Sequence, residues 1–353
     1  MKRLGQVPPV GIAGVYVEVG DRVVTSEEFS RLSGVPRDVI EGKLGFTNLR
    51  RWSGIRDDQT ALVDASLHAM AGLDPRRLDL IVCLLHPFHL EADVYGIGVM
   101  VKERLGAVNA EVTEVLDTCA SVTLALQMCR ELFLSESRLQ HALIVGLVSI
   151  SNLLDYSHPA TRWASAISDG CGALLVSRNP DLDNVLLETS HFCSPEFIDD
   201  VVLSSTDPLA EPITYKKRFR RLVPQRLDMR DPDSFKGRLD PVSHAAYVRA
   251  VRESLQASGF EDRELDLLGA NTMKPSMWAR ILRALELDPA TQIYDEENGH
   301  VAFLDQFLRI RQVREERRLP RGGVLVLVTG GVGFHWTATT VAFKGPRLEG
   351  KAA

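Results

Sequence analysis

The sequence predicts an α/β fold, and two observations carry this prediction. Short runs rich in Val, Leu and Ile recur along the chain with almost no polar alternation, which is typical of strands buried on both faces of a sheet. Segments with helical spacing of apolar residues lie between these runs, and strands that alternate with helices indicate an α/β architecture. With 353 residues, the chain is long enough for two packed halves or one large duplicated domain.

The predicted elements follow in chain order. The strands cover residues 80–85, 142–148, 172–176 and 324–329, and the helices cover residues 59–71, 121–133 and 241–258. The stretch 181–240 is rich in Asp, Pro and Arg and has few strong periodic patterns. We therefore expect this stretch to be an irregular connection between the two halves.

A weak internal repeat supports duplication. Residues 71–82 read AGLDPRRLDLIV and residues 257–271 read ASGFEDRELDLLGAN, and each segment leads into a predicted strand. This repeat favours an internally duplicated βαβ fold. We place the halves at residues 1–178, with the candidate nucleophile, and 179–353, with the candidate base and a glycine-rich loop.

Composition and charge argue against several classes of protein. The chain is 45% hydrophobic and 25% charged, as in soluble globular proteins, and its net charge of −6 argues against a general nucleic-acid binder. No apolar run reaches the roughly 20 residues that a membrane span needs. The N-terminal segment lacks the hydrophobic region and cleavage site of a secretory signal. We expect a cytoplasmic protein that binds neither nucleic acid nor membrane.

The five cysteines predict neither a disulfide framework nor a metal site. Their number is odd, their spacings are wide, and no Cys-x-x-Cys pair occurs among Cys83, Cys119, Cys129, Cys171 and Cys193. Most free cysteines are small buried hydrophobic residues, and we expect this for four of the five.

Cys119 lies in a setting that favours reactivity. It follows a short β-type run and precedes an apolar helix that opens with the small residues Ala120 and Ser121. A cysteine at a helix N-terminus faces unsatisfied N–H groups and the positive end of the helix dipole, and both favour the thiolate. The small residues leave room for an acyl chain. For this segment alone, a buried structural cysteine is an equally good interpretation.

Three further motifs accompany the cysteine. Residues 43–52 read KLGFTNLRRW, residues 167–173 read ISDGCGA, and residues 330–336 read GGVGFHW. With the Cys119 segment, they resemble in order the K-x-G-[IF]…R motif, the DG-x-GA turn and the GGGF-x-W loop of the ketoacyl synthase III family. The resemblance covers nearly the whole chain, and the combination is specific although each motif alone is weak.

The resemblance implies the thiolase fold, a five-layered αβαβα sandwich of two duplicated βαβ halves, usually as a homodimer. It also implies an acyl group carried as a thioester on Cys119, and an oxyanion hole made by the amides of Cys119 and Val332. Gly331 and Gly333 would adjoin the substrate. The donor would be a thioester of acyl-carrier-protein phosphopantetheine or of coenzyme A, so we expect no tightly bound cofactor.

The chain departs from the condensing members of this family at two motifs. Those members use a histidine in HQAN and an asparagine in GN-x-x to bind a malonyl thioester as it loses carbon dioxide. Here residues 268–271 read LGAN, so Leu268 is interpreted as replacing the histidine, and His300 stands in place of the asparagine. Leucine donates no hydrogen bond, so we do not expect decarboxylative condensation. Asn271 contacts a substrate or satisfies loop backbone.

His300 and Asp305 are predicted to supply other chemistry. His300 would be the general base beside Cys119, and Asp305 would orient its imidazole, as acyl transfer to oxygen or nitrogen requires. This Cys-His-Asp pattern resembles acyltransferases of natural-product biosynthesis, above all 6-methylsalicylyl transferases of the pactamycin and chlorothricin type. The alternatives are a surface histidine after the acidic residues 295–297 and a first-turn helix carboxylate at Asp305.

Three other features carry weaker predictions. The basic run 215–221 suits an acyl carrier protein, a polyketide synthase carrier domain or coenzyme A phosphates, although a solvated linker is the favoured interpretation. His86 and His89 lack further ligands at metal-binding spacing, so we expect a pocket-wall or dimer-contact role instead. Asn152 follows a predicted strand and has only this position in its favour.

The sequence therefore predicts an acyltransferase of secondary metabolism. It would move an acyl group from a carrier-protein or coenzyme A thioester, through Cys119, to a hydroxyl or amine of a small-molecule acceptor. A decarboxylative condensing enzyme and a noncatalytic partner subunit are the alternatives.

Overall fold

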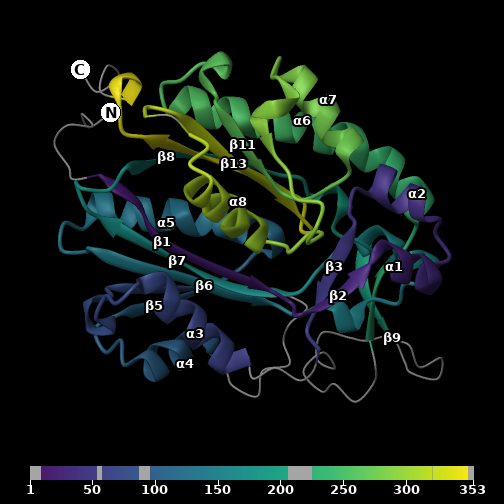
Figure 1. Ribbon diagram of the computed structural model, residues 1–353, viewed down its shortest axis with the longest axis horizontal. Coiled ribbons are helices and arrows are strands. Elements are labelled where there is room, and N and C mark those ends of the chain that lie inside the picture. Colours follow the sequence, from purple (N-terminus) through teal and green to yellow (C-terminus); the bar gives the residue numbers. More distant parts are fainter. Residues whose placement is uncertain (1–8, 54–57, 87–95, 206–224, 320, 349–353) are drawn as a thin grey trace.

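The computed structural model describes residues 9–53, 58–86, 96–205, 225–319 and 321–348 (Figure 1). Two five-stranded sheets and their helices form five layers. Helices α3 and α4 cover the outer face of the first sheet, α5 and α8 lie between the sheets, and α6 and α7 cover the outer face of the second. This arrangement confirms the predicted α/β class and its five layers. Among the described residues, no helix combines the length and apolar character that a membrane span requires.

The first sheet has the order β1-β7-β6-β4-β5. Strands β1 and β7 pair antiparallel, as do β7 and β6, whereas β6, β4 and β5 run parallel. The three strands predicted in the first half are confirmed as β4, β6 and β7. The strands of this sheet are β1 (Val10–Val19), β4 (Leu80–Leu85), β5 (Glu111–Leu116), β6 (His141–Val148) and β7 (Gly170–Arg178).

The second sheet repeats this arrangement in the order β12-β11-β13-β14-β8. Strands β12, β11 and β13 run parallel, and β13, β14 and β8 pair antiparallel. Position for position, the two sheets share strand order and direction, which agrees with duplicated βαβ halves. Its strands are β8 (Asn184–Cys193), β11 (Leu267–Ala270), β12 (Gln292–Ile293), β13 (Val324–Gly331) and β14 (His335–Phe343).

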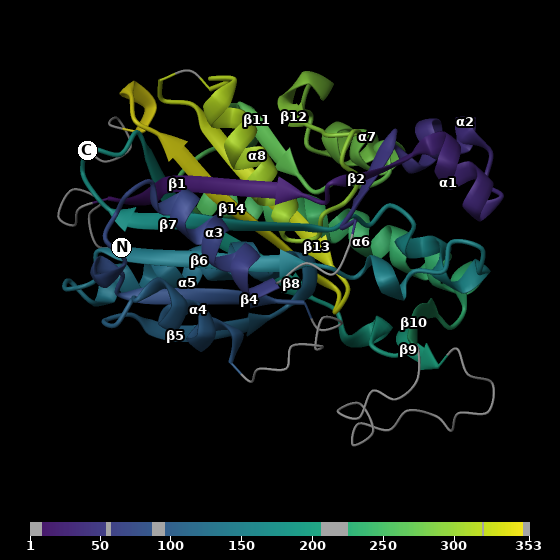
Figure 2. The ribbon, with the colours of Figure 1, turned by 60° about the horizontal axis from the view of Figure 1, so that its bottom comes forward.

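The helices that cover the sheets match the predicted ones and add others. They are α3 (Asp58–Met70), α4 (Ile97–Leu105), α5 (Ser121–Ser135), α6 (Pro232–Ala257), α7 (Pro275–Ala284) and α8 (Leu304–Glu315). Smaller elements gather beyond one end of the sheets (Figure 2). These are β2 (Arg22–Thr25) paired with β3 (Asn48–Arg51), α1 (Ser26–Ser33), α2 (Arg37–Val39), and β9 (Val201–Ser205) paired with β10 (Gln225–Met229).

The prediction of an irregular stretch at residues 181–240 is wrong in part. It contains β8, which is an edge strand and therefore lacks the continuous apolar character of the central strands. It also contains the start of α6, which begins at Pro232 and continues through Pro241. The Asp231 side chain caps this helix by accepting from the Ser234 N–H at 3.1 Å, and proline is tolerated at the first helical position.

Two connections at equivalent places in the halves carry the candidate residues. Cys119 lies between β5 and α5, and His300 lies between β12 and α8. Gly170 and Gly172 of the DG-x-GA motif let α8 approach the first sheet. A Cβ on Gly170 would lie 3.0 Å from Leu304, and one on Gly172 would lie 2.9 Å from the Phe307 ring. The boundary at residues 178 and 179 falls between β7 and β8, and its meaning as a division into folding units stays a prediction.

Candidate active site

Cys119 lies on a strained turn between β5 and α5. The 3-10 turn Thr118–Ala120 precedes the helix, and Cys119 is its middle residue. Thr118 has a φ of 20°, which is unfavourable for a β-branched residue and indicates local strain. Its hydroxyl donates to the carbonyl of Val332 at 2.5 Å and so ties the turn to the glycine-rich segment. The first N–H groups of a helical turn have no intrahelical acceptor, which leaves them available to a ligand.

The structure brings Cys119, His300 and Asp305 together. Cys119 Sγ lies 3.2 Å from His300 Nε2, and His300 Nδ1 lies 2.6 Å from Asp305 Oδ2. The Asp305 carboxylate is fully buried and accepts two backbone N–H bonds, from Thr272 at 2.6 Å and from Val301 at 2.8 Å. The three side chains thus have the order of a nucleophile, a base and an orienting acid.

Backbone bonds fix His300 in this place. Its N–H donates to the carbonyl of Ala166 at 2.7 Å, and its carbonyl accepts from the Ser168 N–H at 2.8 Å. Gly299 has a φ of 63°, and a Cβ there would lie 2.7 Å from the Ala166 carbonyl oxygen, so this turn requires glycine. The histidine is therefore held between the halves and is not a surface-loop residue.

The charges of the site are coupled. Burial disfavours the imidazolium, but Asp305 and Cys119 on opposite sides of the ring raise the pKa of His300 well above its ordinary value. Burial also opposes ionisation of Asp305, yet His300 and Arg309 hold the pKa of that carboxyl below its ordinary value. In contrast, burial raises the pKa of the Cys129 thiol to about 12. Unlike Cys129, Cys119 has an imidazole nitrogen 3.2 Å from its sulfur.

The glycine-rich segment lies against the nucleophile turn. A Cβ on Gly331 would lie 2.4 Å from Thr118 Oγ1 and 2.9 Å from the Cys119 amide nitrogen, so only glycine permits this approach. Gly333 has a φ of 103°, a conformation that favours glycine. Val332 is half-buried between them and lines the cavity described below. The role of the Cys119 and Val332 amides as oxyanion donors stays a prediction.

A second imidazole–carboxylate pair connects β5 to β14. His335 Nδ1 lies 2.8 Å from Asp117 Oδ2, and this bond raises the pKa of His335 although burial opposes it. The pair spans the nucleophile turn and the glycine-rich segment. Sequence reasoning missed it, although Asp117 precedes Cys119 by two residues and His335 lies within the GGVGFHW motif.

The position of Leu268 does not support the role given to it from the sequence. Leu268 is fully buried in β11 among apolar core side chains and does not line the cavity beside Cys119. Asn271, just beyond the strand, is also fully buried and outside the cavity lining, but it contacts Gly330 and Tyr247, which line the cavity. Its Nδ2 donates to the Gly330 carbonyl at 3.4 Å, and its Oδ1 accepts from the Tyr247 hydroxyl at 3.2 Å. Leu268 therefore gives no argument against condensation. Whether this site can bind a malonyl thioester depends instead on Asn271.

A cavity of about 220 Å³ opens beside Cys119 and His300. Its polar wall includes Tyr247, whose hydroxyl stays protonated because burial raises the pKa of that group. Sequence reasoning missed Tyr247, because nothing local in α6 distinguishes it from other buried aromatic residues. Most of the remaining wall is apolar and includes Ile150, Trp163, Ile167, Leu227, Phe235 and Met273.

The other sequence predictions have mixed outcomes. His86 is buried and lines the cavity, as the pocket-wall alternative predicted. His89, the basic run 215–221 and the Asn152 side chain lie outside the described residues. Within the described ranges, no cluster of three His, Cys, Asp or Glu side chains could hold a metal ion. None of the five cysteines, all of which lie in the described ranges, forms a disulfide. The expectation that the cysteines other than Cys119 are buried is wrong for Cys193, which is exposed.

Comparison with known proteins relates this chain to one family of sequences. The family profile of 3-oxoacyl-[acyl-carrier-protein (ACP)] synthase III matches residues 113–194, which include Cys119. The β-ketoacyl-[acyl-carrier-protein] synthase III of Prochlorococcus marinus is 29% identical over 177 residues, about half of each chain. The chain thus spans about half the length of that relative. The corresponding synthase III of Alkalilimnicola ehrlichii is 22% identical over 337 residues, 94% of this chain and 98% of the relative.

Solved structures confirm the fold. The 3-oxoacyl-[acyl-carrier-protein] synthase III of Aquifex aeolicus superimposes with a TM-score of 0.79 at 16% identity, covering 95% of this chain and 100% of that one. A priming β-ketosynthase of a polyketide biosynthetic pathway gives a TM-score of 0.81 at 18% identity and covers 96% of this chain and 98% of that one. The thiolase fold that the motifs implied is therefore present.

Proposed function

We propose that this ketoacyl synthase III-like protein is an acyltransferase that carries its acyl group as a thioester on Cys119. The observation that carries the proposal is the hydrogen-bonded row of Cys119, His300 and Asp305, with 3.2 Å from sulfur to imidazole and 2.6 Å from imidazole to carboxylate. A thiol with an oriented base in reach is suited to covalent acyl transfer.

The first half-reaction loads the enzyme. The Cys119 thiolate attacks the carbonyl carbon of the donor thioester, and the oxyanion accepts hydrogen bonds from the amides of Cys119 and Val332. Each such donor stabilises the transition state by about 3 kcal/mol. The intermediate then breaks its bond to the donor sulfur, which leaves as a thiol after taking the proton that His300 holds. The acyl-enzyme and a neutral imidazole remain.

The second half-reaction transfers the acyl group. His300 removes the proton from an acceptor hydroxyl or amine as that group attacks the Cys119 thioester. The carbon–sulfur bond breaks, and the thiolate returns beside the newly formed imidazolium. Asp305 stabilises this imidazolium and keeps the ring oriented. The starting state is thereby restored, so the cycle needs no other cofactor.

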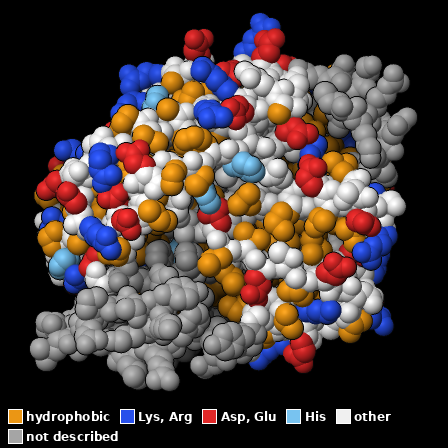
Figure 3. All heavy atoms as spheres, turned by 180° about the vertical axis from the view of Figure 1, so that it is seen from behind, with side chains coloured by type: hydrophobic (Ala, Val, Ile, Leu, Met, Phe, Trp, Pro, Cys, Tyr) orange, Lys and Arg blue, Asp and Glu red, His pale blue; other side chains and the backbone are white. Residues whose placement is uncertain are grey.

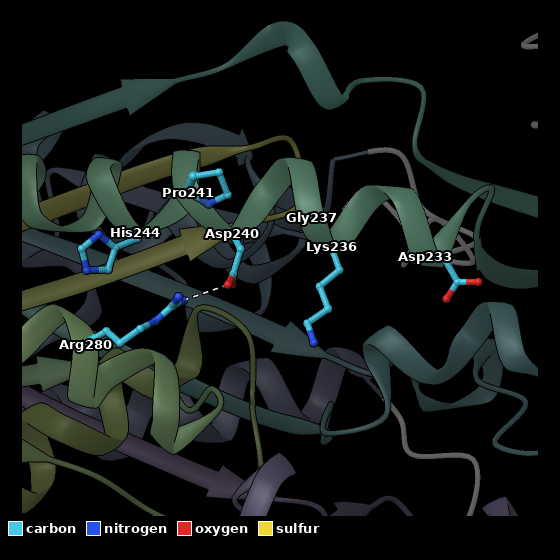
Figure 4. Close-up of a pocket in the computed structure, with 7 residues that line it drawn as sticks. All are labelled: Asp233, Lys236, Gly237, Asp240, Pro241, His244 and Arg280. Atoms are coloured by element: carbon cyan, nitrogen blue, oxygen red, sulfur yellow. Dashed lines mark hydrogen bonds and ion pairs between the residues drawn. The ribbon is translucent and has the colours of Figure 1, made fainter.

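A surface groove along α6 and α7 offers a place for the donor (Figure 4). Lys236, His244 and Arg280 supply nitrogen groups there, and Arg280 pairs with Asp240 at 3.0 Å. Lys274 lines the cavity and lies near the groove, since burial and the neighbouring charge of Lys236 lower its pKa. The groove also contains Asp233 and Asp240, so its lysine and arginine charges are offset by two carboxylates. Lys236 and the nearby Lys274 are the groups that we propose for the phosphate of a carrier-protein phosphopantetheine or of coenzyme A.

The cavity favours a compact acyl group. Its walls are largely apolar and partly aromatic, and it is small beside typical ligand pockets of roughly 300–1,000 Å³. A short or aryl acyl group fits this space better than a long alkyl chain. A 6-methylsalicylyl group, passed to a small-molecule acceptor in secondary metabolism, is the substrate that we propose to test first.

Decarboxylative condensation is the second candidate, because the similar sequences carry the name of ketoacyl synthases. In that reaction Asn271 would have to bind the malonyl thioester oxygen. Its amide already bonds to Gly330 and Tyr247, and His300 is held as a base by Asp305. These contacts favour transfer over condensation.

The test is intact-protein mass spectrometry after incubation with acetyl, benzoyl, 6-methylsalicylyl and malonyl thioesters of N-acetylcysteamine and coenzyme A. We expect an adduct of whole-acyl mass in the wild type and in Cys193→Ala, and none in Cys119→Ala. Cys193 is the matched control because it is an exposed free thiol.

An adduct that persists in Cys119→Ala would overturn the proposal. Release of carbon dioxide from the malonyl donor, dependent on Cys119, would favour condensation instead. Labelling of no cysteine by any donor would favour a noncatalytic partner subunit.

A further inference from the structure

Arg309 is a fully buried arginine on α8, one turn beyond Asp305. Its Nε–H donates to the Ala270 carbonyl at 3.0 Å, and its Nη2 donates to Thr272 Oγ1 at 2.8 Å. Its Nη1 lies 3.8 Å from Asp295 Oδ2 and makes no hydrogen bond within the described structure. A buried guanidinium costs several kcal/mol unless other groups compensate it. The position therefore implies a role for the charge.

The contacts of Arg309 connect it through Thr272 to Asp305 and His300. Thr272 accepts from Arg309 through its hydroxyl and donates its backbone N–H to Asp305 Oδ2 at 2.6 Å. The same carboxylate oxygen lies 2.6 Å from His300 Nδ1. A Cβ on Gly269 would lie 3.3 Å from the Cβ of Arg309, so glycine in β11 gives the arginine room. Arg309, Asp305, His300 and Cys119 thus form one buried row.

The charges of this row differ between the two half-reactions. In the proposed mechanism the free enzyme reacts as a Cys119 thiolate beside a His300 imidazolium, so the anions of the row are then Asp305 and Cys119 and its cations are Arg309 and His300. In the acyl-enzyme Cys119 carries no charge, so His300 no longer faces an anion on that side. The positive charge of Arg309, which also faces Asp295 at 3.8 Å, is then the charge that offsets Asp305 when His300 is in the neutral form that acts as a base. Without the arginine charge, the neutral combination would be Asp305 with an imidazolium. Since uncompensated buried charge is unfavourable, His300 would then keep its proton.

We propose that Arg309 is a positioning residue for the second half-reaction, because its fixed charge compensates Asp305 and lets His300 release its proton once Cys119 is acylated. This inference rests on the proposed function. It agrees with the lowered pKa of the Asp305 carboxyl, which burial opposes and to which both His300 and Arg309 contribute.

Other titratable groups face the row from the elements packed against it. Asp295 and Tyr294 adjoin Arg309, and burial raises the pKa of Tyr294 as it does that of Tyr247. On the cavity wall, the remaining ionisable groups are His86, Arg162 and Lys274. Of these groups, His86, Arg162 and Lys274 are unchanged in every variant, whereas Asp295 and Tyr294 lose a neighbouring cation in Arg309→Met and keep one in Arg309→Lys.

The test follows the decay of the acyl-enzyme in water for wild type, Arg309→Met and Arg309→Lys. Each protein is acylated with benzoyl-N-acetylcysteamine, freed of donor, and followed by intact-protein mass spectrometry between about pH 5 and 9. In the wild type we expect the decay rate to rise with a midpoint within about one unit of 6.5, the ordinary imidazole value. Arg309→Met should raise this midpoint by about one unit or more, and Arg309→Lys should largely restore it.

Acylation of Cys119 should stay within a few fold of wild type in both variants. If Arg309→Met lowers the maximal decay rate of the acyl-enzyme but leaves the midpoint of its pH dependence unchanged, Arg309 has a structural role alone and the inference is overturned. A Lys variant that behaves like the Met variant would also overturn it. If Arg309→Met does not fold, a wild-type midpoint about two or more units above 6.5 would still contradict the inference. Absence of any adduct in wild type would overturn the proposed function, and the inference with it.

Discussion

At the scale of single residues, Gly331 lets the glycine-rich segment lie against the nucleophile turn because it has no side chain. An alanine Cβ there would lie 2.4 Å from Thr118 Oγ1 and 2.9 Å from the Cys119 amide nitrogen. We expect Gly331→Ala to displace the Val332 amide from the oxyanion and to slow Cys119 acylation about 100-fold, as loss of one oxyanion donor does. Single-turnover acylation measured by mass spectrometry checks this. Gly42→Ala is the control, because a Cβ on Gly42 meets no atom within 4 Å, and equal rates in the two variants would refute the prediction.

The sequence could predict the residue types of the site but not all of their positions. Cys119, His300 and Asp305 stand out because each lies in a motif with a fixed order along the chain. Leu268 and Asn271 were harder, because the end of β11 is decided by its pairing with β13 and not by the letters of the motif. Tyr247 and Arg309 act through contacts with residues far away in sequence, which no local pattern records.

At the scale of elements, the bond between Asp117 and His335 ties the end of β5 to the start of β14. This bond raises the pKa of His335, so its contribution to stability is complete below the unfolded-state value near 6.5 and is lost as pH rises through the higher folded value. The imidazole is 36% exposed, so the contribution should be about 1 kcal/mol or less.

We therefore expect the free energy of unfolding of His335→Gln to fall below that of wild type mainly at low pH. Urea denaturation at a series of pH values measures this difference, which should shrink toward zero in alkaline solution. His191→Gln, an exposed histidine on the neighbouring β8, is the matched control and should show no such trend. A difference that does not vary with pH would rule out the ionised bond as its cause.

Strands that are buried on both faces could be predicted from the sequence, whereas partly exposed strands could not. Strands β4, β6, β7 and β13 are covered on both faces, so their residues are apolar almost without interruption. The edge strand β8 lacks that signal because more than half of its residues are only partly buried or exposed. The predicted helix 241–258 lacks the first turns of α6 because a proline such as Pro241 is typical of a helix start. The helix starts instead at Pro232, with Asp231 as its N-cap.

At the scale of the whole molecule, duplication explains how the site is assembled. The two sheets share one strand order, and equivalent strand-to-helix connections supply Cys119 from one half and His300 from the other. The base and nucleophile therefore meet only when the halves pack. Among the described side chains on the face seen in Figure 3, basic and acidic groups are interspersed, which agrees with the modest net charge of −6.

The open edge of the first sheet predicts how two copies associate. Among the described strands, β5 pairs with β4 alone, and an unpaired edge is a template for another strand. Leu116 at its end is 56% exposed, next to the nucleophile turn. We predict a homodimer in which β5 lies against a second copy, and that Leu116→Asp converts it to a monomer, because the interface would bury the new charge. Sedimentation analysis measures the mass. Ile198→Asp, at a residue 69% exposed and outside both sheets, should leave the dimer intact, and a dimeric Leu116→Asp protein would place the interface elsewhere.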